Sequence, residues 1–328
     1  MHAVTFDPAT DHFAVRDLPV PQPGPGEVRV RVDACGLNPV DAKIIYWKGA
    51  ATGMNADWVP GLDVAGVVDA LGPGVDGWRL GDRVLYHGNM FRPYGGFAEF
   101  AIHAAATLTP HPNVPAVEAA AMPCAAWTAY RSLVDKLHVQ PGQSLLVIGG
   151  AGGVGSFAVQ FARYLGMDPI IATCSTHNFD LVRQFGATDV LDYHEGAVGK
   201  RVRTLTGGAG VQKAIDTVGY DNDLDAAEAL AFEGELVELV DLARPEQYRD
   251  AFGRSLSFHQ FSLGAAHRNG PAAQARLVEV GRTVAALQEG GAIRPHISSV
   301  IPLEQVGDRM IAMLRRTTVG KIVMSNLV

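Results

Sequence analysis

Two different patterns of apolar and polar residues divide the chain. Over the first hundred residues, short apolar runs alternate with Gly and Pro, as in VRVRV (28–32), VAGVV (64–68), DRVLY (82–86) and GGFAEFAI (95–102). Short strands separated by turns are typical of a β-rich, partly irregular domain. From about Pro115 the pattern changes to Ala- and Leu-rich helical segments, which a proline at 123 interrupts and which end before Pro141.

The middle of the chain alternates apolar runs with helical patterns. Strands are expected at 144–149, 169–174, 189–192, 213–218, 234–240 and 257–264, and two of the helices between them end near Leu165 and Phe185. This alternation predicts βαβ units and a parallel, doubly wound sheet. The last sixty residues predict a helix around 272–289, a second with apolar residues at helical spacing over 303–314, and a closing strand at 321–324.

The onset and end of the strand–helix alternation set the expected domains. We predict an α/β protein in which residues 122–267 form a Rossmann dinucleotide-binding domain, while residues 1–121 with 268–328 form one β-rich domain across a cleft. The length of 328 residues also fits two domains.

Composition limits the function classes. Apolar residues make up 48% of the chain and charged residues 19%, which suits a compact protein with a large core. The net charge of -7 disfavours nucleic acid as a partner. The most apolar stretch, 145–166, contains five glycines between 149 and 155 and an arginine, so no membrane span is expected. Three cysteines without C-x-x-C spacing, and an N-terminus without a signal pattern, favour the cytoplasm.

A glycine motif carries the first candidate chemistry. The sequence LLVIGGAGGVGSFAVQFARYLG matches G-x-G-x-x-G at Gly150, Gly152 and Gly155, after an apolar strand and at the start of a helix. Glycine allows the tight turn, and the free N–H groups at a helix start bind a pyrophosphate. The cofactor-binding residues expected in this turn are Ala151, Gly152, Gly153 and Val154. A glycine-rich packing turn without a ligand is the alternative.

The end of the second strand indicates which dinucleotide binds. An acidic residue there would bind the ribose diol of NADH, but the sequence continues Ser175, Thr176, His177. Hydroxyl and imidazole groups donate hydrogen bonds to a 2′-phosphate, so NADPH is the expected cofactor. Ser175 and Thr176 are equally well explained as helix N-caps.

Five segments in this order resemble a known family: GLNPVDAKI (36–44), PGLDVAGVV (60–68), GGFAEF (95–100), PCAAWTAYRSL (123–133) and GGAGGVGSFAVQFAR (149–163). Together they resemble the zinc-free quinone oxidoreductase-like branch of the medium-chain dehydrogenase/reductase superfamily. The resemblance covers essentially the whole chain. It implies a Rossmann domain inserted into a β-rich, GroES-like catalytic domain, and a soluble oxidoreductase.

The resemblance also bears on metal. Zinc-binding relatives carry a Cys where this chain has Asn38, and a His–Glu pair where it has Leu62 and Asp63. An aliphatic side chain cannot ligate zinc, and the four clustered cysteines of the structural zinc site are missing. No metal is therefore expected, and Asp63 is expected to have a structural or supporting role.

The resemblance suggests Asn38 and Tyr46 as catalytic residues. The corresponding Asn lies beside the nicotinamide, where its amide orients the cofactor or the substrate, although an Asn before Pro39 also forms turns. Tyr46 stands near tyrosines that line the substrate site in relatives, with a packing role equally plausible. Thr128 corresponds to a threonine at the nicotinamide end, or else bonds its own helix backbone.

Further cofactor residues follow from the same resemblance. Tyr193 matches a tyrosine near the 2′-phosphate, whereas Phe179 replaces a lysine found in many NADPH-using relatives. The remaining expected cofactor-binding residues lie at strand ends or beyond them, where glycines are also common in turns: Val218 and Gly219 near the adenosine, Leu263 and Gly264 near the nicotinamide. His87 and His267 are expected to be solvated loop histidines.

The resulting hypothesis is an NADPH-dependent, zinc-independent reductase that transfers hydride to a quinone or to an α,β-unsaturated carbonyl compound, with a small molecule as its substrate. An alcohol dehydrogenase of the same superfamily and a non-catalytic NADPH-binding protein are the alternatives. The short-chain dehydrogenase class is excluded, because no tyrosine has a lysine four residues later. The largely apolar last strand, 257–263, predicts pairing of sheet edges in a homodimer, unless the helix from Ala272 covers that edge.

Overall fold

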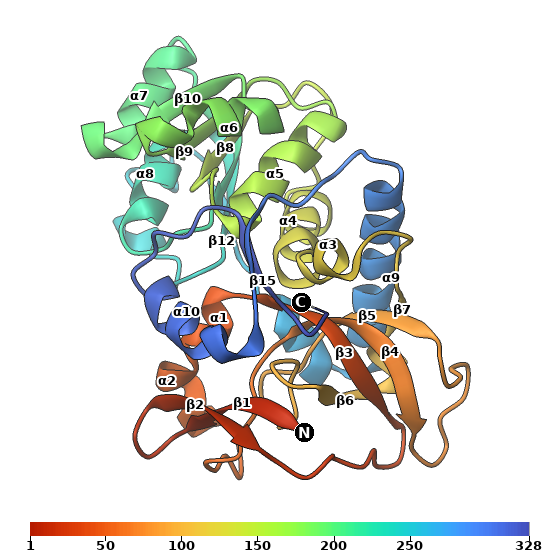
Figure 1. Ribbon diagram of the computed structural model, residues 1–328. Helices are drawn as coiled ribbons and strands as arrows, with labels where there is room; N and C mark the ends of the chain where they lie inside the picture. The colour runs from red at the N-terminus through yellow and green to blue at the C-terminus, as the bar shows by residue number, and fades with distance from the viewer. Residues whose placement is uncertain (328) are drawn as a thin grey trace. The chain divides into compact units, whose positions relative to one another are not determined.

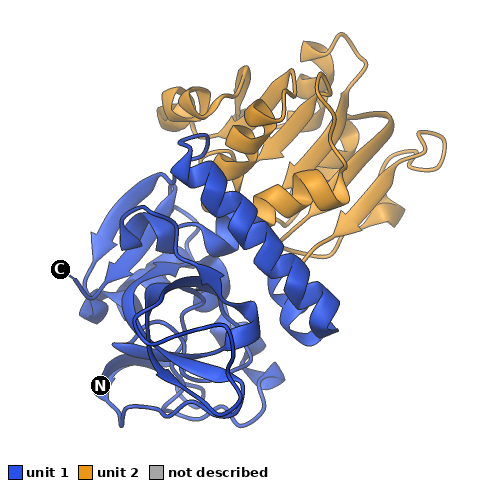
Figure 2. Cartoon of the chain, turned by 90° about the vertical axis from the view of Figure 1, so that its right-hand side faces the viewer, with its two compact units in different colours: residues 1–127, 263–328 blue, residues 128–262 orange. Residues whose placement is uncertain are grey.

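The computed structural model describes residues 1–327 and divides the chain into two compact units. Unit 1 comprises Met1–Trp127 and Leu263–Val328, and unit 2 comprises Thr128–Ser262 (Figure 2). Each unit has its own sheet and its own hydrophobic core. The first and last parts of the chain therefore fold together, and the middle forms a separate unit.

Unit 2 contains a six-stranded parallel sheet in the order β10-β9-β8-β11-β12-β13. Taken along the chain, this is strand order 3-2-1-4-5-6, the arrangement of dinucleotide-binding Rossmann folds. The strands are β8 (Leu145–Ile148), β9 (Ile170–Cys174), β10 (Asp189–Asp192), β11 (Val211–Asp216), β12 (Leu230–Glu238) and β13 (Ser257–Gln260) (Figure 1). The doubly wound sheet predicted from the sequence is confirmed.

Helices precede or connect these strands. They are α4 (Thr128–Arg131), α5 (Gly153–Tyr164), α6 (Phe179–Phe185), α7 (Val198–Leu205) and α8 (Asn222–Ala229). All four residues of β8 are buried, as are all five of β9, which is why both strands are continuously apolar. The strand expected at 257–264 ends earlier, at Gln260, and Leu263 begins a 3-10 helix, η8 (Leu263–Arg268), in unit 1.

Unit 1 is built on a second sheet that joins both ends of the chain. Its path is β14-β15-β3-β4-β5-β7, and β6 also pairs with β3. The strands are β3 (Glu27–Leu37), β4 (Asp63–Leu71), β5 (Arg83–His87), β6 (Phe100–Ala104), β7 (Thr109–Pro110), β14 (Ile297–Ile301) and β15 (Lys321–Ser325), beside a hairpin of β1 (His2–Asp7) and β2 (His12–Asp17). The C-terminal β15 lies antiparallel to β3, so the first and last segments of the chain share one sheet.

Unit 1 has short helices and one long one. They are α1 (Pro39–Ala42), α2 (Ile44–Trp47), α3 (Ala116–Ala120), α9 (Gly270–Glu289) and α10 (Val306–Met313). The helical pattern after Pro115 is broken by two π-helical segments, Pro123–Trp127 and, in unit 2, Ser132–Lys136. The expected strand at 95–102 is wrong in its start, because β6 begins at Phe100. The backbone N–H groups of residues 95–97 donate instead to the carbonyls of residues 59–61, and Ala98 forms an isolated bridge with Ala3.

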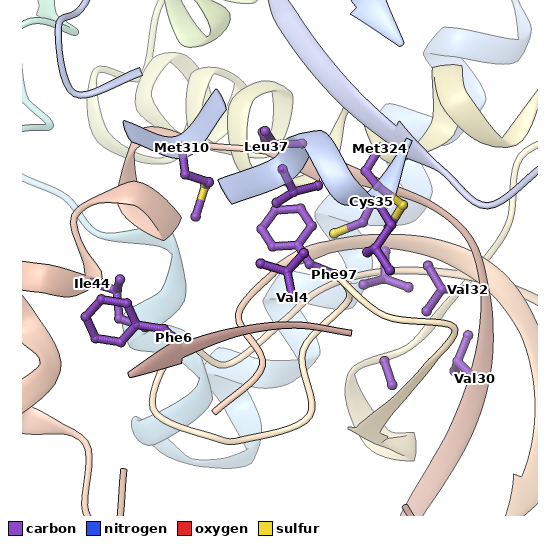
Figure 3. Close-up of a cluster of buried hydrophobic side chains, with 14 of the residues drawn as sticks. Val4, Phe6, Val30, Val32, Cys35, Leu37, Ile44, Phe97, Met310 and Met324 are labelled. Carbon is purple, nitrogen blue, oxygen red and sulfur yellow. The ribbon is translucent and has the colours of Figure 1, made fainter. Parts of the chain in front are cut away.

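The core of unit 1 lies between the sheet, the β1–β2 hairpin and α10. Figure 3 shows Cys35 and Leu37 of β3 near Met324 of β15 and Met310 of α10, with Phe97 beside them. The apolar positions predicted for the last helix are thus core positions. No helix within residues 1–327 is both long enough and apolar enough to cross a membrane.

Candidate active site

The predicted phosphate-binding turn joins β8 to α5. Gly149 has φ +84°, which favours glycine, and its N–H donates to Thr173 Oγ1 on β9 at 3.0 Å. Gly150 N–H donates to the Thr173 carbonyl at 2.8 Å. Gly152 is the N-cap of α5, so the first N–H groups of the twelve-residue helix lie at the end of the turn.

Gly155 shows why the third glycine is needed. A Cβ at this position would lie 2.1 Å from the Gly149 carbonyl oxygen, well inside contact distance. Only glycine lets α5 approach the turn this closely. The motif therefore has the strand–turn–helix geometry that a dinucleotide requires.

The residues expected at the adenosine end lie at the ends of two neighbouring strands. Ser175 follows β9 and Tyr193 follows β10, and their hydroxyl oxygens are 3.0 Å apart. Thr176 and His177 form the next 3-10 turn, where His177 is exposed. The Arg183 guanidinium lies 5.5 Å from the centroid of the Phe179 ring, so a cation lies beside the position where relatives carry lysine.

The sequence interpretation missed Asp192, the last residue of β10. It is the register partner of Cys174, and its Oδ1 accepts hydrogen bonds from the backbone N–H of His194 at 2.9 Å and from its ring Nδ1 at 2.7 Å. These bonds lower the pKa of Asp192, so it is ionised at neutral pH. Asp192 ends the third strand of the sheet in chain order, so the residues at the end of the second strand do not reveal it. Its negative charge opposes phosphate binding near Ser175.

Val218 and Gly219 follow β11, on the other side of the phosphate turn. Both backbone N–H groups donate to Asp216 Oδ1, at 2.8 and 3.1 Å. Gly219 has φ +81°, and a Cβ there would lie 2.4 Å from Asp241 Oδ2. The loop that the sequence assigned to the adenosine is therefore held by a buried carboxyl group.

In unit 1, Asn38 lies at the centre of a buried polar network. Its Nδ2 donates to Asp63 Oδ2 at 2.9 Å and to the Gly36 carbonyl at 3.3 Å. Its Oδ1 accepts a hydrogen bond from Lys321 Nζ, which also donates to the Leu37 carbonyl at 3.0 Å. Asn38 is also the N-cap of α1. It therefore begins a helix, as an Asn before a proline often does, and it also contacts charged groups.

Two carboxyl groups and one ammonium group share this interior. Lys321 Nζ lies 3.5 Å from Asp63 Oδ2, and Cys124 N–H donates to Asp63 Oδ1 at 2.9 Å. Burial raises the pKa of Asp63 to about 6, although Lys321 and Asn38 oppose the rise. Burial and the charge of Asp63 raise the pKa of Asp41 to about 8. At neutral pH Asp41 therefore carries a proton.

His87 is not the solvated loop histidine that the sequence suggested. It is the last residue of β5, buried, and its Nδ1 has no hydrogen-bond partner among the described residues. Burial lowers its pKa to about 3, so the ring is neutral. His267 Nε2 donates to the His87 carbonyl at 2.9 Å, and Gly264 lies against His87.

The two residues expected to be catalytic differ in their burial. Tyr46 is 75% exposed on α2, whereas Asn38 is buried. Thr128 is buried at the start of α4, where its carbonyl accepts from Ser132 Oγ at 2.8 Å. Leu263 is buried at the start of η8.

A cavity of about 180 Å³ lies next to this network within unit 1. Asp41 and Leu62 line it together with Asn89 and Arg92. The other lining side chains include six aromatic rings: Trp47, Trp58, Tyr86, Tyr94, His103 and His267. The hydroxyl of Tyr86 is buried without a hydrogen-bond partner among residues 1–327. The lining of the cavity is therefore rich in aromatic side chains.

Family models and relatives agree with this architecture. Residues 24–113 match the alcohol dehydrogenase GroES-like domain, and residues 153–268 match the zinc-binding dehydrogenase domain. The quinone oxidoreductase of Rattus norvegicus is 30% identical over 294 residues, 88% of this chain and 85% of the relative. The chain belongs to the quinone oxidoreductase-like members of the medium-chain dehydrogenase/reductase superfamily.

Solved structures of this superfamily extend the likeness to the whole chain. A mycobacterial protein crystallised with NADPH has a TM-score of 0.85 and 29% identity, covering 99% of this chain and 100% of its own. An NAD-dependent alcohol dehydrogenase has a TM-score of 0.83 and 30% identity, covering 99% of both chains. This oxidoreductase family thus includes proteins described with either dinucleotide.

The zinc-binding name of the second family model raises the question of metal. Asp63, His87 and Cys124 offer ligand atoms within 4.8 Å of one another. However, both oxygens of Asp63 already accept hydrogen bonds, and the Lys321 ammonium group lies beside one of them. The Lys321 ammonium group would repel a dication at this position. The dication would also compete with Lys321 for the Asp63 carboxylate, which stabilises the buried ammonium group. The donor set fits zinc poorly.

Proposed function

We propose that this oxidoreductase uses NADPH to reduce quinones or α,β-unsaturated carbonyl compounds without a metal ion. The observation that carries the proposal is the aromatic cavity next to the Asn38 network in a protein that also has a dinucleotide turn. When bound, NADPH supplies the hydride. Conjugated acceptors suit a site of this kind, because the charge spreads into an enolate or hydroquinone that hydrogen bonds can stabilise.

The chain's own residues would orient and stabilise the acceptor. Aromatic rings stack on a planar ring system, and Tyr86 and Asp41 contribute to the lining although both side chains are buried. Both ends of the Asn38 amide are bonded to protein groups. We therefore assign Asn38 a positioning role, in which it keeps Lys321 and Asp63 together behind the cavity.

The coenzyme assignment is supported by the hydroxyl pair Ser175–Tyr193 and by the NADPH complex of the mycobacterial relative. Asp192 and Phe179 reduce the preference for the phosphate. We infer a moderate preference for NADPH over NADH, of about 1 to 3 kcal/mol, the scale of one or two charge-assisted hydrogen bonds.

Oxidation of NADPH followed at 340 nm across a panel of quinones, enals, enones and simple ketones tests the proposal. Turnover is expected with the conjugated acceptors and should persist after dialysis against a chelator. Turnover with simple ketones alone would instead support an alcohol dehydrogenase. Tight NADPH binding without turnover on any acceptor would support a non-catalytic binding protein.

A further inference from the structure

Two buried acids end neighbouring strands of the parallel sheet in unit 2. Asp216 is the last residue of β11 and Glu238 the last residue of β12, and they are partners in the strand register. Their relative exposures are 0% and 1%. Side chains at paired positions of adjacent strands project from the same face of the sheet, which places these two carboxyl groups side by side.

Each carboxyl group binds the loop that follows its own strand. Asp216 Oδ1 accepts from the N–H groups of Val218 and Gly219 at 2.8 and 3.1 Å. Glu238 Oε1 accepts from the N–H groups of Val240 and Asp241 at 2.7 and 2.9 Å. In both cases the bonded amides belong to the second and third residues after the acid. The same pair of hydrogen bonds therefore holds each loop.

The second oxygen of each group has no conventional partner. Asp216 Oδ2 and Glu238 Oε2 are shut off from solvent and unpaired within residues 1–327. Two adjacent buried carboxylates repel each other strongly, whereas a single shared proton turns one into a donor to the other. Burial and the neighbouring Glu238 raise the pKa of Asp216 to about 8.

The charged groups around the pair have partners of their own. Asp241 Oδ2 accepts from Tyr220 N–H at 2.6 Å. On α8, Asp223 is bonded to Arg244 and, at 3.1 Å, to the Tyr248 hydroxyl. Because these charged groups are bonded elsewhere, a shared proton is what links Asp216 to Glu238.

The remaining charged neighbours within residues 1–327 are paired with other groups. On the far strand, His259 of β13 lies 3.6 Å from Glu235, and Lys213 also pairs with Glu235, at 2.6 Å. On the β8 side the register partner of Asp216 is the apolar Ile148.

We propose that Asp216 and Glu238 form a proton-sharing pair that holds loops 217–219 and 239–241 together, so that the dinucleotide binds only while the pair keeps its proton. This inference rests on the proposed function in one respect, since Val218 and Gly219 are assigned to the cofactor. Loss of the proton leaves two like charges in a buried site, which separates the loops and adds negative charge near an anionic ligand.

The test is the dissociation constant of NADPH, measured by fluorescence between pH 7.5 and 9.5. Above pH 8, the affinity of the wild-type protein should fall by about tenfold per pH unit, as expected for one linked proton. In Glu238→Gln the amide oxygen keeps the bonds to the 239–241 loop, and the amide nitrogen donates to Asp216 permanently. This variant should bind with an affinity independent of pH over the same range.

Glu233→Gln is the matched control, because Glu233 is exposed on the same strand. It should retain the wild-type pH profile. Identical profiles for the wild type and Glu238→Gln would overturn the proposal.

A second measurement keeps the proposal independent of the coenzyme assignment. If the wild type fails to bind NADPH at pH 7.5, the proposed function fails, and urea unfolding of the free protein then tests the pair. A carboxyl that holds its proton up to about pH 8 when folded, but releases it near pH 4 when unfolded, makes stability fall as pH rises between these values. The urea midpoint of the wild type should therefore fall relative to that of Glu238→Gln, and parallel midpoints would contradict the pair.

Discussion

Lys321 is a charged residue buried in the interior of unit 1. It is 3% exposed, and it contacts two groups that a buried position could not otherwise satisfy, the Asn38 amide oxygen and the Asp63 carboxylate. A buried charge is tolerated only when it is paired and hydrogen-bonded. The network is therefore a stability element as well as part of the proposed site.

Replacing Lys321 with Met should destabilise the protein by about 3–5 kcal/mol at pH 8, because Asp63 is left as a buried, unpaired charge. The loss should be smaller near pH 6, where protonation of Asp63 removes that charge. Urea unfolding at the two pH values measures both effects. Lys200→Met, at an exposed lysine of α7, is the control and should leave stability unchanged. Equal stability of the two variants would show that the network contributes nothing.

Ser175 tests the coenzyme assignment. Ser175→Asp places a carboxylate beside Tyr193, where a 2′-phosphate is proposed to bind. The preference should invert, mainly through coenzyme affinity. We expect the wild type to favour NADPH by about 1 to 3 kcal/mol of binding free energy, and Ser175→Asp to favour NADH by about the same amount. Dissociation constants for NADPH and NADH measure the change, with Ser175→Ala as the uncharged comparison. If the wild type binds both coenzymes equally and Ser175→Asp alters neither, these residues do not form a phosphate site.

At the scale of elements, the contact between α5 and the end of β8 decides whether the dinucleotide turn exists. The turn depends on the absence of a side chain at Gly155, which faces the Gly149 carbonyl. A helix of twelve residues cannot shift locally without also moving its apolar face away from the sheet.

Gly155→Ala should therefore lower both stability and coenzyme affinity. We expect about 1–3 kcal/mol of destabilisation from overpacking, together with weaker NADPH binding as the turn opens. Gly49→Ala provides the matched control, since a Cβ at Gly49 meets nothing within 4 Å. Thermal unfolding and NADPH titration of the two variants give the comparison. Wild-type affinity in Gly155→Ala would mean that the turn does not cradle the pyrophosphate.

At the scale of the whole molecule, β13 is the outer strand of the unit 2 sheet. Three of its four residues are exposed, and Phe258 is 42% exposed. An unpaired edge with an apolar side chain favours pairing with a second copy.

We expect a homodimer through this edge. Light scattering at micromolar concentration should give twice the monomer mass for the wild type, and Phe258→Lys should shift the protein toward the monomer, because a lysine on an edge strand opposes pairing. Phe252→Lys, at a side chain that is 99% exposed in the same unit but outside the strand, should remain dimeric. A monomeric wild type would rule out the dimer.

Metal content is the other property of the whole molecule. Elemental analysis of protein incubated with zinc and then dialysed should find less than one zinc per chain, because Lys321 and the hydrogen bonds to Asp63 oppose binding at Asp63, His87 and Cys124. Stoichiometric zinc that His87→Ala removes would refute the zinc-independent mechanism.

The sequence alone determined the features that local physics sets. Apolar runs at strand period, helical spacing and a glycine turn in the right context were enough to predict the parallel sheet of unit 2, α9, and the α5 turn, since each depends on residues close together in the chain. The tertiary structure decided what lies next to what. Lys321 and Asn38 are 283 positions apart, and His87 became buried because its strand pairs inside the sheet. Asp216 and Glu238 face each other because β11 and β12 share a register, and no periodic pattern records contacts of this kind.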